Sequence, residues 1–254
     1  MEINMPIQLT ESSSIKFSNI CKAEARKSTD TQAAKTIILT TVFLTIAMFV
    51  VSIFRFEDGA PWTKAVAAIS SPATTILAIS FILLVCEEWT RGTALITYTF
   101  VPQRSKVILA KFVVLLECFL GTILLVYALS ALAAIIGAGM HGYSINWTPS
   151  ITSVVSLAGP LLVNLLFGYS MALATQETTL ALGLYFILPP VTVVATQLPV
   201  IGEYMKWVSL EHSSSMFVAG ATSVTVPQYI CSIIVWIVIP SIFGIIRNMK
   251  RDMN

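Results

Sequence analysis

Residues 112–136 read FVVLLECFLGTILLVYALSALAAII, and this stretch decides the class of fold. Only one of its residues, Glu117, carries a charge. A helix needs about 20 mostly apolar residues to cross the hydrocarbon core of a bilayer. The stretch therefore predicts a transmembrane helix.

Five further mostly apolar runs of comparable length lie along the chain, at residues 36–54, 72–89, 149–175, 178–198 and 227–246. Three of them begin with proline, at Pro72, Pro149 and Pro227. Proline suits the first helical turn, where its missing N–H has no partner to lose and its fixed φ matches the helix. We therefore predict an all-α integral membrane protein, with six transmembrane helices in residues 36–254. Three of these helices are predicted to begin at Pro72, Pro149 and Pro227.

The composition excludes other classes of protein. Of the 254 residues, 56% are hydrophobic and 11% are charged, which is too apolar for a soluble globular domain or a disordered chain. A net charge of +2 gives no reason to expect a nucleic-acid partner. The four cysteines have no CxxC spacing, so we interpret them as reduced residues and predict neither disulfides nor a metal site.

The distribution of Lys and Arg predicts the orientation in the membrane. Cytoplasmic connections carry an excess of these residues. The tail before residue 36, the connection around residues 90–111 and the C-terminus hold 12 of them, whereas the opposite side has Arg55, Lys64 and Lys206. We expect both termini to be cytoplasmic, in a multi-pass protein of a bacterial plasma membrane.

Residues 1–35 are expected to form a tail that contains one short helix. Phe17, Ile20, Cys21 and Ala25 follow the spacing i, i+3, i+4 and i+8, which predicts an interfacial helix on the inner leaflet. The alternative is a solvated basic tail. A second interfacial helix is expected within residues 199–226, where the segment dips into the outer membrane interface.

Familiar nucleotide and metal motifs do not fit this chain. Gly137, Gly139 and Gly142 match GxGxxG, but they close a membrane span instead of opening a helix after a strand. Tyr143 stands where a phosphate-binding loop requires lysine. The only two histidines fall in outer connections, away from Glu87 and Glu88. We predict no catalytic residues, no bound metal and no enzymatic activity in this chain.

The connection from Glu87 to Lys111, EEWTRGTALITYTFVPQRSKVILAK, combines paired acids, a Gly-Thr pair, a proline and a basic cluster. It resembles the membrane subunits of ATP-binding cassette transporters of the type-2 permease family. The positions that match that family are Glu88, Gly92, Thr93, Pro102, Arg104, Ser105 and Lys111. Residues 22–30 resemble the connecting helix of the family. Residues 96–101 have strand-like propensity, so a helix there rests on the resemblance alone.

The resemblance implies a permease subunit of an ATP-driven exporter. A separate cytoplasmic ABC ATPase, present in two copies, would bind ATP and Mg, and this chain would hold no cofactor. The other partners would be membrane lipid and a second permease, either another copy or a similar chain. Segment 90–106 would couple to the ATPase through Arg91, Gly92, Thr93, Leu95, Phe100, Pro102 and Arg104.

The apolar spans indicate a hydrophobic or amphiphilic substrate, such as a drug, a lipid or a membrane-active peptide. Polar lining for its path is expected only at Asn164, Tyr127 and Glu117, with Glu88 near the inner gate. Glu117 either reaches the inner interface or pairs with a basic or hydroxyl group of another helix.

An ion-gradient-driven carrier that uses Glu117 is the main alternative, and a purely structural membrane subunit is a third. Carriers often place ionisable groups and interrupted helices near the midplane. Pro160 and the pair Pro189-Pro190 are the candidates for such interruptions.

Overall fold

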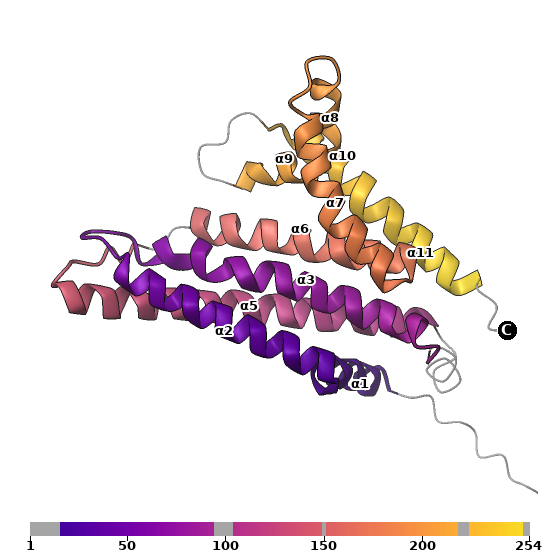
Figure 1. The fold of residues 1–254 in the computed structure, drawn as a ribbon, viewed down its shortest axis with the longest axis horizontal. Coiled ribbons are helices and arrows are strands. Elements are labelled where there is room, and N and C mark those ends of the chain that lie inside the picture. The colour runs from indigo at the N-terminus through magenta and orange to yellow at the C-terminus, as the bar shows by residue number, and fades with distance from the viewer. Residues whose placement is uncertain (1–15, 94–103, 149–150, 218–223, 251–254) are drawn as a thin grey trace, which may run out of the picture.

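The computed structural model describes residues 16–93, 104–148, 151–217 and 224–250, and all regular structure within these ranges is helical (Figure 1). The elements are α1 (Phe17–Asp30), α2 (Gln32–Phe54), η1 (Trp62–Ala65), α3 (Val66–Thr90), α5 (Arg104–His141), α6 (Ile151–Thr175), α7 (Thr178–Ala195), α8 (Gly202–Val208), α9 (Leu210–Ser214), η2 (Ser215–Phe217), α10 (Val226–Ile233), η3 (Ile234–Val238) and α11 (Ile239–Lys250). Six stretches are long and apolar enough to cross a membrane: α2, η1 with α3, α5, most of α6, α7, and α10 through α11. The predicted all-α fold with six spans is confirmed at this level.

The prolines mark helix starts less well than expected. α3 begins at Val66, after the turn η1, so the prediction that Pro72 opens this helix is wrong. An interior proline is tolerated in a span because neighbouring helices and local adjustments satisfy the freed backbone groups. Pro149 lies outside the described residues. Pro227 does occupy the first turn of α10, where the backbone N–H of Thr225 donates to Gln228 Oε1 at 2.9 Å.

The prolines in the later spans do not interrupt their helices. Pro160 lies inside α6, and Pro189 and Pro190 lie inside α7, and both helices continue through them. Thr192 donates its hydroxyl to the Pro189 carbonyl at 2.9 Å. The interruptions that the carrier hypothesis would use are therefore not present in these helices.

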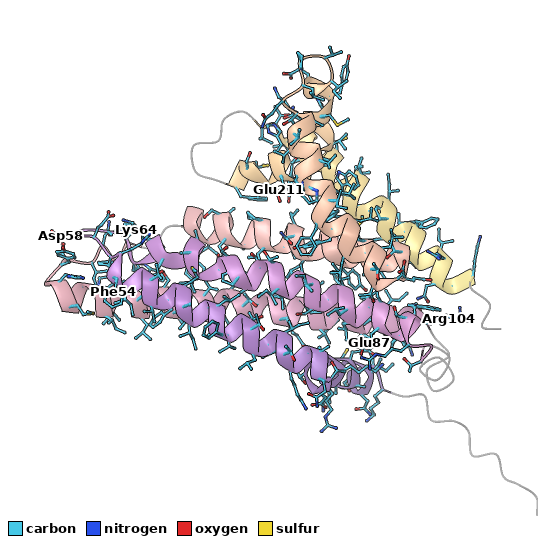
Figure 2. All side chains as sticks on the ribbon, viewed as in Figure 1. Phe54, Asp58, Lys64, Glu87, Arg104 and Glu211 are labelled. Carbon is cyan, nitrogen blue, oxygen red and sulfur yellow. The ribbon has the colours of Figure 1, made fainter. Side chains whose placement is uncertain are left out.

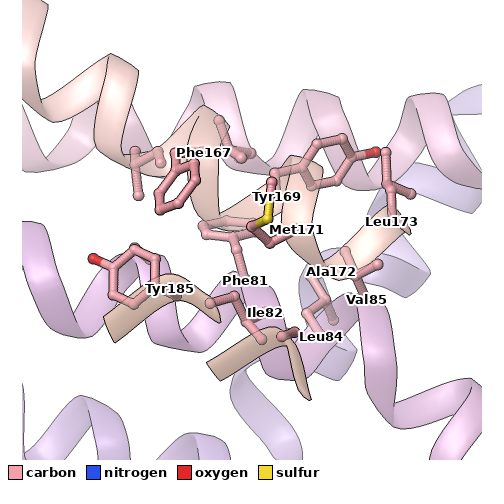
Figure 3. Packing of buried hydrophobic residues seen from close by; sticks show 14 of the residues in the cluster. Phe81, Ile82, Leu84, Val85, Phe167, Tyr169, Met171, Ala172, Leu173 and Tyr185 are labelled. Carbon is pink, nitrogen blue, oxygen red and sulfur yellow. The ribbon is translucent and has the colours of Figure 1, made fainter. Parts of the chain in front are cut away.

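α3 and α6 form the centre of the bundle. About half of the residues in the apolar window of each are buried, against about a fifth in α2, α5, α7 and the last span. Figure 1 shows α2, α3, α5 and α6 running side by side, while α7 to α10 lean away from this group. The core between them is shown in Figure 3, with labelled residues Phe81, Ile82, Leu84, Val85, Phe167, Tyr169, Met171, Ala172, Leu173 and Tyr185.

One glycine sets the distance between α6 and α11. A Cβ added at Gly244 of α11 would overlap the carbonyl carbon and oxygen of Leu173. Real Cβ atoms do not approach backbone this closely, so only glycine allows the two helices to touch here.

The beginning of α5 and the end of α11 lie at the same end of the bundle, because Arg104 Nη1 donates to the Asn248 carbonyl at 2.6 Å. α1 also lies at this end (Figure 1). We call it the inner end, after the orientation that the Lys and Arg distribution predicts, and the opposite end the outer end.

Candidate functional site

Four charged side chains meet at the inner end of the bundle. Lys111 of α5 places its Nζ 2.6 Å from Glu24 Oε2 of α1 and 3.4 Å from Glu88 Oε2 of α3. The same ammonium donates to the Leu84 carbonyl at 3.1 Å. The ammonium therefore has two hydrogen-bond acceptors and a second carboxylate close by, which compensates for its burial.

Lys27 of α1 completes this group. Its Nζ lies 2.9 Å from Glu24 Oε1 and 2.6 Å from Glu88 Oε1, on the side opposite Lys111. Glu24, Lys27, Glu88 and Lys111, which we call the charge cluster, thus form a neutral ring of alternating sign. Glu24, Glu88 and Lys111 are at most 5% exposed. Burial lowers the pKa of Lys27, but the hydrogen bond and charge of Glu88 outweigh it with help from Glu24, and the net pKa is raised.

The charge cluster fixes α1 to the bundle. A helix is present at the predicted residues, and one residue of its apolar stripe is buried against the bundle. Ile20 is buried where α1 packs along α5, while Phe17, Cys21 and Ala25 of the same stripe stay partly exposed. Lys22 and Arg26 remain on the exposed side of α1. The helix is therefore held by both apolar contact and ion pairs.

Part of the predicted coupling segment can be placed. Arg91 forms an ion pair with Glu87 at 2.9 Å, and Gly92 adopts a left-handed φ of 69° that ends α3. Thr93 is exposed. Arg104, at the start of α5, binds the Asn248 carbonyl as described above. Leu95, Phe100 and Pro102 lie outside the described residues. The segment thus leaves α3 just after Glu88 and enters α5 shortly before Lys111.

The four predicted gate or pathway residues are not brought together. Glu88 belongs to the charge cluster. Glu117 lies on the exposed side of α5 and forms no ion pair within the described part of the chain. It is near α1, since burial and the Glu117 carboxylate raise the pKa of the Cys21 thiol. Tyr127 packs against Trp62 with ring centroids 5.7 Å apart.

Asn164 lines a groove at the outer end, between α3, α6, α7 and α9. The groove consists of a pocket of about 400 Å³ beside α3 and a pocket of about 310 Å³ beside α7, and both are lined by Pro160 and Asn164. We call it the outer groove. Its polar lining residues are Thr63, Lys64, Ser70, Ser71, Thr74, Thr75, Ser156, Asn164, Tyr185, Glu211 and Ser214. Of the residues predicted to line a path, Asn164 lies in this groove, and this face of the bundle carries more polar side chains than the sequence led us to expect along a path.

A chain of contacts supports one wall of the outer groove. The Tyr185 hydroxyl donates to Asn164 Oδ1 at 2.6 Å, and the Tyr185 ring stacks on Phe167 at 5.9 Å. The Phe167 and Trp236 rings are nearly perpendicular with centroids 6.2 Å apart, and Trp236 Nε1 donates to the Val208 carbonyl at 2.6 Å. Trp236 lies in η3, a π-helical turn, and such turns are frequent at functional sites. The wall is thus tied to α8 at the outer end.

Comparison with known protein families, with curated proteins and with solved structures gives no match to this chain. Among the described residues, no three His, Cys, Asp or Glu side chains lie close enough to hold a metal ion. The charge cluster and the outer groove are therefore the two sites from which a function can be argued.

Proposed function

We propose that this chain is the permease subunit of an ATP-driven exporter of hydrophobic or amphiphilic molecules. A separate cytoplasmic ABC ATPase, in two copies, would bind ATP and Mg and hydrolyse the nucleotide. The observation that supports this most is the position of the charge cluster. It joins α1, α3 and α5 beside the two ends of the predicted coupling segment, residues 90–106.

This position suits the transfer of force from a partner. A push on segment 90–106 would reach Glu88 through the last turn of α3 and Lys111 through the first turns of α5. Because the buried carboxylates and ammonium of the charge cluster pair across α1, α3 and α5, we expect these three helices to move together. The outer half of α3 lines the outer groove, so this motion changes the groove.

The outward surfaces of the spans are consistent with lipid and with a second permease. Large apolar side chains are exposed along α2, α5, α7 and α11, including Phe43, Leu124, Ile187 and Phe243. A span surface of this kind is covered by hydrocarbon chains or by another span. A second copy or a similar permease would enclose the path together with this chain.

The test is co-expression with candidate ABC ATPases, followed by measurement of pull-down yield and substrate-stimulated ATP hydrolysis. Leu95→Ala with Phe100→Ala should lower one or both quantities, since buried apolar anchors dominate most interfaces. Lys106→Ala is the control and should do little, because Lys106 is partly exposed and surface ion pairs contribute roughly 0–1 kcal/mol. Wild-type values for the double variant would refute the proposed coupling segment.

The carrier hypothesis predicts a different result from the same preparation. Transport in proteoliposomes without an ATPase would then follow an imposed ion gradient, and Glu117→Gln would abolish it. Glu117 is not among the residues that line the outer groove, and the helices are unbroken at Pro160 and Pro189. The structure thus offers this hypothesis no further support.

A further inference from the structure

We propose that the outer groove binds the transported molecule and that Glu211 selects molecules carrying a positive charge, so the ligand class is the cationic amphiphiles. That the bound molecule is transported rests on the proposed function. The binding site itself rests on the shape, lining and charge of the groove.

The shape fits a molecule of drug size. The two pockets share Pro160 and Asn164, so one ligand can extend across both. Apolar lining is supplied by Val163, Phe186 and Leu210, while α3 contributes hydroxyl side chains to both pockets. Ligand sites of this kind combine apolar walls with a few polar groups that fix orientation.

The charge of the groove favours a cation. Glu211 lines the pocket beside α7, is exposed, and has no ion-pair partner in the part of the chain that the structure describes. Figure 2 shows it where α9 approaches α6 and α7. The positive charge in the groove, Lys64, is already paired with Glu57 at 2.5 Å. The groove therefore presents one unpaired negative charge.

Two further features of the same pocket suit an organic cation. The rings of Tyr185 and Phe186 both line it, 5.1 Å apart and nearly perpendicular. An aromatic face attracts a cation within about 6 Å. Asn164 uses its oxygen for Tyr185, and its amide nitrogen has no acceptor among the described residues, which leaves a donor for a polar group of the ligand.

The experiment uses two probes of equal size and opposite charge, tetraphenylphosphonium and tetraphenylborate. Equilibrium binding of each is measured to the full chain in phosphatidylcholine nanodiscs, with empty nanodiscs subtracted. Wild type should bind the cation more tightly than the anion. Glu211→Gln should weaken cation binding about fivefold, the effect of one partly exposed ion pair. Glu211→Lys should weaken it further and favour the anion.

Two additional variants locate the effect. Thr75→Trp places a large ring in the same pocket and should weaken binding of both probes. Glu203→Gln removes a carboxylate that is 82% exposed and bound to Lys206, outside the groove, and should change nothing. Because the three groove variants alter exposed residues, their elution on size exclusion should match wild type.

The outcomes separate this inference from the proposed function. Wild-type cation binding in Glu211→Gln and Glu211→Lys would overturn the charge selection, and wild-type binding in Thr75→Trp would overturn the site. Neither measurement involves an ATPase. If binding behaves as expected but no ABC ATPase couples to the chain, the groove stands as a cation site and the exporter assignment fails.

Discussion

Replacing Lys111 with Met tests the charge cluster most directly. Methionine keeps much of the length of the side chain but removes its charge and its three donors. Glu24 Oε2 then loses its partner at 2.6 Å, Glu88 Oε2 loses its contact at 3.4 Å, and the Leu84 carbonyl loses its donor. Lys27 remains as the cation that contacts both carboxylates.

The magnitude follows from burial. Removing one partner of a buried ion pair typically costs about 3–5 kcal/mol, because the other charge is left uncompensated. Since Lys27 still neutralises part of the negative charge, we expect the lower value, about 3 kcal/mol. With about 1.36 kcal/mol for each factor of ten, the equilibrium constant for release of α1 rises about 150-fold.

The assay measures that release. Ile20 belongs to α1 and is only 5% exposed while this helix is docked. A cysteine at this position, in a cysteine-free background, should therefore react with maleimide only when α1 detaches. Lys111→Met should raise the labelling rate by about two orders of magnitude. Lys22→Met is the control, since it removes the same charge from the exposed side of α1.

The alternating charges of the cluster lead to a second prediction, which concerns an exchange of two of its residues. Exchanging the residues at positions 24 and 111 would rescue an isolated pair, but here it brings an ammonium next to Lys27 and a carboxylate next to Glu88. The exchange should therefore fail to restore slow labelling. Glu24→Gln with Lys111→Gln, which keeps the pair of Lys27 with Glu88, should do better than Lys111→Met alone. Slow labelling in Lys111→Met would refute the energetic importance of the cluster.

Three other predictions concern packing, pH and topology. Gly244→Ala should cost about 1–3 kcal/mol and lower the thermal midpoint in detergent, whereas Gly139→Ala, whose added Cβ meets nothing within 4 Å, should leave it equal or higher. The backbone N–H and hydroxyl of Ser144 bind the Asp58 carboxylate and lower its pKa below the ordinary 3.8. This link stabilises the outer connections above that pH and is lost as the pH falls further, so amide protection of Ser144 should drop only in acid and be absent in Asp58→Ala. In intact cells, a single cysteine at Ser144 should react with impermeant maleimide and one at Ser105 should not; the reverse pattern would invert the orientation.

The class of fold could be predicted from the sequence because the length of an apolar run has one physical meaning in a bilayer. The start of the second span could not, because Pro72 is compatible with either the first turn or the interior of a lipid-embedded helix. The packing of the neighbouring helices determines which of these two positions Pro72 occupies, and a single sequence does not show that packing.

The sites were harder to predict than the spans. Glu88 and Lys111 could be noticed as charges at the edges of apolar runs, where each needs a partner. That Glu24 and Lys27 supply those partners depends on the docking of α1, a contact between residues far apart in the chain. The run SSPATT at residues 70–75 was a visible sign of a polar face on α3. Glu211 had no such sign, because only the fold brings α9 to α6 and α7.

α3 connects the two sites. It runs without a break from Val66 to Thr90, with Glu88 in the charge cluster and Thr75 in the outer groove. At about 1.5 Å per residue these two positions are about 20 Å apart, so any displacement of Glu88 is carried through one helix to the groove. Pro72 lies beyond Thr75 toward the outer end, and the hydrogen bond that its missing N–H cannot make weakens the helix there. The outer part of α3 can therefore bend at the groove while the ion pairs at the inner end stay intact, which is the separation that the proposed transport cycle would require.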